Sequence, residues 1–311
     1  MNTIYVALSC DDNYARYAAA VIVSALESLD SAWRMECAVL HGGLSAESIA
    51  CLERLGNERL RVRLVDSSSC RLLRELPEMA HWTTAMYYRF LVVEAFSPNV
   101  DRVIYLDCDV LVLRSLHHLY GEDFEGAAIA AVENPGTHRL RALQIKKNKK
   151  YFNSGVLLIN LAAWRTMPIL QSAMMVAERF KGKLVNPDQD MLNVMFDGDV
   201  KLLDPRWNVQ VSMFRGWRYA TAYLMNPWVV HFTTQLKPWS LADPHPYANE
   251  YRLFARLVGV TPTPLRIGDR VKYPVRLIRR YLVFYLRVLL DVIGSFCWIS
   301  VLKDFAPAGW F

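Results

Sequence analysis

Apolar runs alternate with helical patterns over the first 110 residues, and this alternation limits the possible folds more than any other feature of the chain. Strands that alternate with helices pair in parallel and are joined by right-handed crossovers. The sequence therefore predicts an α/β fold on a mostly parallel, Rossmann-like sheet. The expected strands are 3–8, 36–40, 59–65 and 103–106, and the expected helices are 15–29, 45–55 and 85–96.

The pattern continues less regularly as far as two prolines, Pro262 and Pro264. Beyond them the composition becomes basic and then strongly apolar. We therefore expect one large domain over residues 1–260 and a C-terminal helical appendage over 261–311. Within the domain, further strands are expected at 127–132, 156–161 and 228–232, and further helices at 169–181 and 190–196.

The cysteines and the N-terminus both indicate a cytoplasmic protein. With 53% hydrophobic residues over 311 positions, the chain can bury a large core without the help of disulfide bonds. None of its six cysteines forms a CxxC pair, so a reduced environment is the simplest interpretation. The start, MNTIYVALSC, lacks the basic residues and long apolar stretch of a signal peptide.

The stretch VIYLDCDVLV places Asp107 and Asp109 at the end of an apolar strand. Residues two apart in a strand point to the same side, and ligands of open parallel sheets bind at the carboxyl ends of strands. Two carboxylates that converge there repel each other unless a cation lies between them. Mn²⁺ and Mg²⁺ take carboxylate oxygens and bridge to diphosphates. The alternative is a solvated turn, which the flanking apolar runs disfavour.

Two further stretches contain groups that could contact a nucleotide. Asp11, Asn13 and Tyr14 follow the first strand, where many doubly wound folds bind nucleotides; an Asx turn at the start of the next helix would explain the same residues. His231 ends a late apolar strand and could bind a metal, and Lys237 could neutralise phosphate. A core histidine and a surface lysine fit that local pattern equally well.

Amides and carboxylates beside apolar segments form the last group of candidates. Asn153 lies in YFNSGVLLIN, and Asp188 and Gln189 lie in NPDQDMLN. Bidentate polar side chains of this kind are suited to sugar hydroxyls. Helix capping is the alternative explanation for Asp188.

The motifs, taken together and in this order, resemble glycosyltransferase family 8. They are DDNY at 11–14, YLDCD at 105–109, FNSG at 152–155, DQD at 188–190, and the segment 231–239 with its KPW. The resemblance covers about residues 3 to 260 and is strongest to bacterial lipopolysaccharide α-galactosyltransferases and α-glucosyltransferases, with glycogenin more distant. It implies a GT-A fold, a UDP-hexose donor, Mn²⁺ with Mg²⁺ as the alternative, and retention of anomeric configuration.

The resemblance also implies a role for each motif residue. These are metal binding for Asp107, Asp109 and His231; nucleotide binding for Asp11, Asn13, Tyr14, Asp107 and Lys237; donor-sugar binding for Arg89, Asn153, Asp188 and Gln189; and the acceptor side for His81 and Glu133. Gln189 would lie near the anomeric carbon, but an amide is a poor nucleophile. Attack on the leaving-group face is therefore favoured, with Asp188 as the candidate for a covalent route.

Two stretches depart from that pattern or add to it. The family usually has a glycine shortly after the histidine, where the backbone nears the phosphates, whereas Thr233 and Thr234 stand there in this chain. The basic stretch 137–150 is expected to be a loop that could belong to a lid over the donor and could meet an anionic acceptor.

The residue pattern of the appendage predicts that it binds a membrane. Seven basic residues and a single acid, Asp269, lie between Arg266 and Arg287. On a helix, the polar residues fall on one stripe beside an apolar face, which is typical of helices that lie on anionic membranes. We therefore expect peripheral attachment to the inner face of the membrane and no nucleic-acid partner. A helix packed on the protein's own core is the alternative.

Two other functions share some of these features. A sugar-1-phosphate nucleotidyltransferase also uses a doubly wound sheet and metal carboxylates, but it would normally have a glycine-rich loop after the first strand, and residues 9–14 contain no glycine. A catalytically inactive nucleotide-sugar-binding protein would be favoured by loss of the metal-binding residues, all of which are present. The predicted function is therefore a retaining hexosyltransferase that moves galactose or glucose from a UDP-sugar to a saccharide acceptor. The resemblance implies that this acceptor is lipopolysaccharide or another cell-surface glycan.

Overall fold

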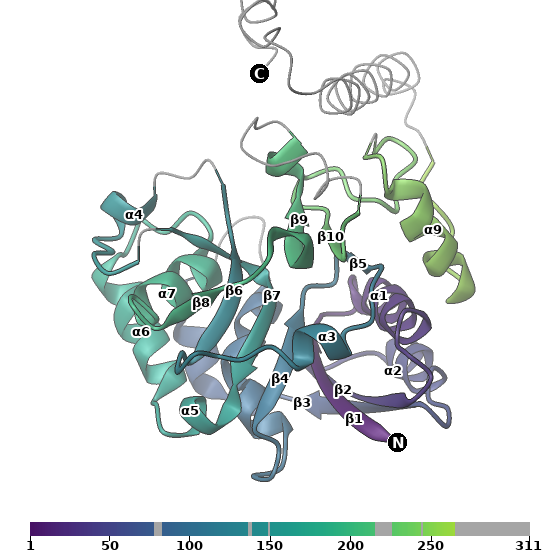
Figure 1. Ribbon diagram of the computed structural model, residues 1–311, viewed down its shortest axis with the longest axis horizontal. Helices are drawn as coiled ribbons and strands as arrows, with labels where there is room; N and C mark the ends of the chain where they lie inside the picture. The colour runs from purple at the N-terminus through teal and green to yellow at the C-terminus, as the bar shows by residue number, and fades with distance from the viewer. Residues whose placement is uncertain (78–82, 136–138, 149, 215–225, 244, 265–311) are drawn as a thin grey trace, which may run out of the picture.

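The computed structural model describes residues 1–264 apart from 78–82, 136–138, 149, 215–225 and 244 (Figure 1). Seven strands form the large sheet in the order β3-β2-β1-β4-β7-β6-β8, and three form a small sheet in the order β5-β10-β9. The strands are β1 (Asn2–Ser9), β2 (Trp33–His41), β3 (Leu60–Asp66), β4 (Arg102–Leu106), β5 (Val110–Val112), β6 (Ile129–Glu133), β7 (Phe152–Asn160), β8 (Val200–Leu202), β9 (Val209–Gln210) and β10 (Val229–His231).

The large sheet is mixed, although most of its pairings are parallel. Strands β3, β2, β1 and β4 run parallel to one another, and β8 is parallel to β6. Strand β7 is antiparallel to both of its neighbours, β4 and β6. The predicted α/β class with a mostly parallel sheet is confirmed, and the expected strands and helices of the first 66 residues are found within a few residues of their predicted bounds.

Helices cover both faces of this sheet, as the alternation of buried residues requires. In β4, Ile104 belongs to one hydrophobic core and its neighbour Tyr105 to the other, because successive side chains point to opposite faces. Helices α1 (Ala15–Glu27) and α2 (Ala46–Glu53) contribute to the first core. The second core is covered by α5 (Leu161–Arg165), α6 (Ile169–Arg179), α7 (Pro187–Met195) and the segment Thr84–Ala95.

The segment Thr84–Ala95 differs from its prediction. An α-helix is expected over 85–96, whereas the chain forms 3₁₀ turns there. An amphipathic α-helix on a surface has one apolar stripe facing the core and one polar stripe facing water. This segment has no such division, because Tyr87 through Val92 are all buried. This winding places Arg89 inside the protein, on the side of the sheet where β4 ends.

Two elements begin earlier than their sequence pattern predicts. Strand β7 starts at Phe152 rather than 156, so Asn153 and Gly155 lie within the sheet. Helix α7 starts at Pro187 rather than 190, because proline suits the first turn of a helix. Both shifts place motif residues on rigid elements instead of in loops.

Two short helices and one longer one complete the described fold. Helices α3 (His117–Tyr120) and α4 (Arg139–Ala142) lie in connections, and α9 (Ala248–Leu257) packs on α1 and on the small sheet through Tyr251 and Ala255. The basic and apolar stretch of the appendage lies outside the described residues from position 265 onward. Within the described part, no helix has the length and apolar character needed to span a membrane.

Candidate active site

The two sheets meet where β4 ends, and this junction brings distant residues together. Asp107 follows β4, and its backbone N–H donates to the carbonyl of Gly155 in β7, at 2.8 Å. Strand β5 then turns into the small sheet, where Val110 pairs with His231 in antiparallel register. The N–H of Phe232 donates to the carbonyl of Asp109 at 3.0 Å. Backbone pairing therefore sets His231 beside both carboxylates.

The side chains of Asp107, Asp109 and His231 converge on one point. The Nε2 atom of His231 lies 3.1 Å from Oδ1 of Asp109 and 3.7 Å from Oδ2 of Asp107. One ligand atom from each residue falls within 4.8 Å of the other two. Two carboxylate oxygens and an imidazole nitrogen at this spacing fit a divalent cation such as Mn²⁺. The solvated turn considered for the two aspartates is therefore not what forms.

The two carboxylates have different electrostatic surroundings. Burial raises the pKa of Asp107, and the positive charge of Arg89 only partly offsets this. Burial would also raise the pKa of Asp109, but Lys237 and His231 outweigh burial and hold that pKa well below its usual range. Lys237 donates from Nζ to Oδ2 of Asp109 at 2.5 Å and to the carbonyl of Phe232 at 2.9 Å. Lys237 is thus part of the site rather than a surface lysine.

Gly155 makes the close packing of these groups possible. A Cβ atom added at Gly155 would lie 2.1 Å from Cε1 of His231 and 2.7 Å from Oδ2 of Asp107. Contacts this short do not occur for real Cβ atoms, and the imidazole is enclosed on its other sides. Any larger residue at Gly155 would push His231 or Asp107 out of place.

Arg89 connects Asp107, a predicted metal ligand, to Asp188, a predicted sugar-binding residue. Its guanidinium lies 2.7 Å from Oδ1 of Asp107 and 3.0 Å from Oδ2 of Asp188, and it donates to the carbonyl of Ser154 at 2.8 Å. Its Cζ atom lies 4.5 Å from the centre of the Tyr105 ring. Burial would lower the pKa of Arg89, but the two carboxylates raise it above its ordinary value, so the side chain stays charged.

The amide of Gln189 faces β7. Its Oε1 accepts hydrogen bonds from Nδ2 of Asn153 at 2.9 Å and from the N–H of Ser154 at 3.1 Å. Asp188 accepts from the hydroxyl of Ser154 at 3.0 Å. Neither residue caps α7, since the N-cap is Asn186 and its side chain makes no capping bond. The capping alternative for Asp188 is therefore wrong.

Asp190, the third residue of DQD, has a structural role. It is fully buried, and its carboxylate pairs with Arg139 at 2.6 Å and accepts from the hydroxyl of Tyr151 at 2.6 Å. It also accepts from the N–H of Val185 at 2.7 Å, just before α7. Asp190 therefore fixes the position of α7 from which Asp188 and Gln189 project.

The first turn after β1 meets the segment that carries Lys237. The Tyr14 ring stands edge-on to Trp239 with ring centres 5.7 Å apart, and Trp239 stacks on Tyr17 at 3.6 Å. Asp11 accepts a hydrogen bond from the N–H of Tyr14, three residues further on, at 3.1 Å, whereas an Asx turn joins residues two apart. Asn13 is exposed. Tyr14, Tyr17 and Trp239 therefore form an aromatic group where this turn meets the segment that carries Lys237.

The two acceptor-side candidates are less well defined by the structure. Glu133, at the end of β6, pairs with Lys150 through a contact of 2.7 Å. His81 lies outside the described residues. In the basic stretch 137–150, the N–H groups of Lys146, Lys147 and Asn148 donate to Asp197, which ties its described part to the domain.

Comparison with known proteins shows what this site belongs to. Residues 5–242 match the Glycosyl transferase family 8 profile, which is more than half of the chain. The chain belongs to glycosyltransferase family 8. This membership confirms the predicted enzyme class, a hexosyltransferase of a retaining family, and leaves the nucleotidyltransferase alternative without support.

Three relatives illustrate the similarity. The chain is 32% identical over 264 residues to General stress protein A of Bacillus subtilis, covering 78% of this chain and 90% of that protein. It is 30% identical to a lipopolysaccharide 1,2-glucosyltransferase of Escherichia coli, covering 79% and 75%. The crystal structure of the galactosyltransferase LgtC with donor and acceptor sugar analogues superposes with a TM-score of 0.71 at 26% identity, over 86% of this chain and all of that one. The GT-A fold is thereby confirmed.

The structure places three residues at this site to which the sequence analysis gave no role. Asn208 is fully buried and contacts both Asn153 and His231. Ser154 binds Asp188 and Gln189, and the hydroxyl of Tyr105 lies 2.6 Å from that of Ser9. Ser154 and Tyr105 stand inside recognised motifs, so their neighbours could have indicated them. Asn208 follows Pro205-Arg-Trp with no local pattern that points to the site.

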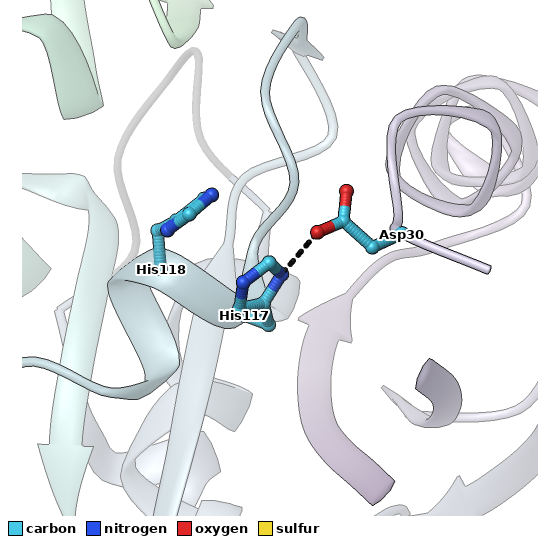
Figure 2. A group of neighbouring side chains, drawn as sticks. All are labelled: Asp30, His117 and His118. Carbon is cyan, nitrogen blue, oxygen red and sulfur yellow. Dashed lines mark ion pairs between the residues drawn. The ribbon is translucent and has the colours of Figure 1, made fainter. Parts of the chain in front are cut away.

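A second group of carboxylate and imidazole side chains lies in the described part of the chain, away from the family 8 motifs. It consists of Asp30, His117 and His118 (Figure 2). His117 is held by the hydroxyl of Ser115 at 2.7 Å and by Asp30 at 3.3 Å, and its ring stacks on Trp33. The Asp30 side chain is 58% exposed. These contacts join α3 to the end of α1, so structural packing accounts for the group.

Proposed function

We propose that this enzyme transfers glucose or galactose from a UDP-sugar to a saccharide acceptor of lipopolysaccharide or another cell-surface glycan, with Mn²⁺ and with retention of configuration. The observation that carries the proposal is the convergence of Asp107, Asp109 and His231 beside Lys237. Sequence similarity to a lipopolysaccharide 1,2-glucosyltransferase and a lipopolysaccharide 1,3-galactosyltransferase supports the choice of sugars and of acceptor. Mn²⁺-dependent release of UDP from a panel of UDP-sugars tests it directly.

The charges of the site suit a diphosphate leaving group. A bound Mn²⁺ would stabilise the negative charge that develops on UDP as the glycosidic bond breaks. Lys237 lies on the same carboxylate as the proposed cation and would neutralise the diphosphate beside it. Tyr14, Asn13 and Asp11 stand on that side and would bind the uridine. Arg89, held between Asp107 and Asp188, would orient the donor sugar with Asn153 and Gln189.

The contacts of Gln189 and Asp188 support attack from the leaving-group face. The carbonyl oxygen of Gln189, its only nucleophilic atom, already accepts two hydrogen bonds from β7. The carboxylate of Asp188 is held by Arg89 and by Ser154, which lowers its nucleophilicity. A diphosphate oxygen of UDP would then take the acceptor's proton. Asp188 remains the candidate if a covalent glycosyl-enzyme is trapped.

Donor choice gives a first prediction. The purified enzyme is expected to turn over UDP-glucose or UDP-galactose at least about 10-fold faster than UDP-N-acetylglucosamine, because its relatives include a glucosyltransferase and a galactosyltransferase. Initial rates of UDP release at equal donor concentrations measure this. Faster use of UDP-N-acetylglucosamine than of both hexose donors would refute it.

We also propose that the enzyme is cytoplasmic and attached to the inner face of the membrane through residues 261–311. The support is the basic stretch from Arg266 to Arg287 followed by apolar residues. A membrane-bound acceptor such as a glycolipid would be reached from this position.

Vesicle binding gives a second prediction. Each basic residue near an anionic surface contributes about 1 kcal/mol, so replacing four of them with glutamine should weaken binding roughly 100-fold or more. The variant changes Lys272, Arg276, Arg280 and Arg287 in the full-length chain. Co-sedimentation with vesicles of phosphatidylcholine and phosphatidylglycerol measures it, and vesicles of phosphatidylcholine alone are the control. Equal binding of wild type and variant, or no binding of wild type at low salt, contradicts the proposal.

A further inference from the structure

The imidazole of His231 is held on its far side by two asparagines. Its Nδ1 atom lies 3.1 Å from Oδ1 of Asn153 and 3.1 Å from Oδ1 of Asn208. The opposite nitrogen, Nε2, faces Asp107 and Asp109. All three side chains of this arrangement, His231 and the two asparagines, are buried, so water does not replace these hydrogen bonds.

The hydrogen bonds determine which nitrogen carries the proton. The backbone N–H of Gly155 can only donate, and it donates to Oδ1 of Asn153 at 2.9 Å. Asn208 donates from Nδ2 to the same oxygen at 2.8 Å, which turns its own Oδ1 toward His231. Nδ1 of His231 therefore meets two acceptor oxygens and must be the donor. The lone pair of the neutral ring then lies on Nε2, directed at the two carboxylates.

We propose that Asn208 is a positioning residue for the metal site: it holds His231 with Nδ1 protonated and Nε2 ready to bind the cation. Metal-binding histidines commonly donate their second nitrogen to a neighbouring group that fixes the ring, and loss of that group weakens metal binding. This inference rests on the proposed metal site at Asp107, Asp109 and His231.

Asn208 is better suited to a test than Asn153. Asn153 also bonds to Gln189 and is proposed to bind the donor sugar, so its replacement would change two functions. The polar contacts of the Asn208 side chain go to Asn153 and His231. Its position is set by the 3₁₀ turn Pro205–Asn208 and by β9, which runs parallel to β10 with Gln210 opposite His231.

The test measures binding of Mn²⁺ alone to the full-length protein, by electron paramagnetic resonance of free Mn²⁺. Asn208→Leu and Asn208→Ala both remove the acceptor, the first with similar volume, and each is expected to weaken Mn²⁺ binding about 10- to 100-fold. In a His231→Ala background, the same changes should alter the affinity less than about 3-fold, because Asn208 acts through His231. The matched control is Asn160→Leu, which removes the cap of α5 at the other end of β7. It should lower Tm and leave Mn²⁺ binding unchanged.

The outcomes separate this inference from the proposed function. If the wild type binds Mn²⁺ and a folded Asn208 variant binds it within 2-fold, the positioning role is wrong and the metal site stands. The positioning role is also wrong if the Asn208 changes reduce the Mn²⁺ affinity as much in the His231→Ala background as in the wild type. If the wild type does not bind Mn²⁺, both the positioning role of Asn208 and the proposed metal site are wrong. Should neither Asn208 variant fold, ¹⁵N NMR of the Mg²⁺-loaded wild type decides: the inference requires a proton on Nδ1 of His231, and a proton on Nε2 refutes it.

Discussion

Replacing Asp109 with asparagine is expected to reduce Mn²⁺-dependent sugar transfer about 100-fold or more. The amide keeps the size of the side chain but removes the charge that faces Nε2 of His231 at 3.1 Å and Nζ of Lys237. Without that charge, the proposed metal site would lose a ligand, and the proposed UDP leaving group would lose its main stabilisation. Initial rates of UDP release with saturating donor and a titration of Mn²⁺ measure the effect.

A matched variant shows whether the fall in transfer rate is specific to Asp109 or follows the loss of any paired carboxylate. Asp30→Asn removes the carboxylate of the group formed by Asp30, His117 and His118, in which Asp30 pairs with His117. Its transfer rate should equal that of the wild type. EDTA should mimic Asp109→Asn, and added Mn²⁺ should restore only the wild type and Asp30→Asn. A folded Asp109→Asn enzyme with a near wild-type rate would remove the basis for the metal site.

Replacing Arg89 with methionine is expected to destabilise the protein by about 3–5 kcal/mol, because it leaves the partly buried carboxylates of Asp107 and Asp188 without their cation. The guanidinium side chain is only 5% exposed, so water does not take its place. Transfer should also be lost in the variant molecules that remain folded, since Arg89 joins the proposed metal-binding and sugar-binding residues. Urea unfolding followed by tryptophan fluorescence measures the stability.

Arg206→Met is the control for the loss of an arginine–aspartate pair. Arg206 and Asp204 are also 2.7 Å apart, but both are 28% exposed, and the guanidinium stacks over Trp228 at 3.7 Å. A loss of no more than about 1–2 kcal/mol is expected there. If Arg89→Met costs no more than Arg206→Met, the connecting role assigned to Arg89 is incorrect.

The sequence predicted the parallel part of the fold well because its signals are local. In β1 and β4, apolar runs bounded by turns and helices are enough to identify strands, and the right-handed crossover rule fixes how they pair. The carboxylates of Asp107 and Asp109 could be found for the same reason, since they end one of these strands. Family resemblance supplied the role expected of Arg89, which its local sequence does not indicate.

The remaining features depend on contacts between distant residues. Strand β5 is only three residues long, and its apolar residues read as a continuation of β4 until the pairing with β10 is known. The 3₁₀ winding around Arg89 arises from burial on several sides, which periodicity does not reveal. Asn208 belongs to the site only because β9 lies beside β10. A local pattern identifies a candidate group, but tertiary pairing decides which groups share a ligand.

The pairing of β5 with β10 also has a consequence during protein synthesis. Asp107 and Asp109 leave the ribosome long before His231, and the imidazole reaches them only when β10 has been made and has joined β5. Contacts between residues so far apart in the chain form slowly during folding. A nascent chain can therefore complete most of the large sheet while the proposed metal site still lacks His231. The proposed metal site is thus assembled by the last described strand to be translated, β10.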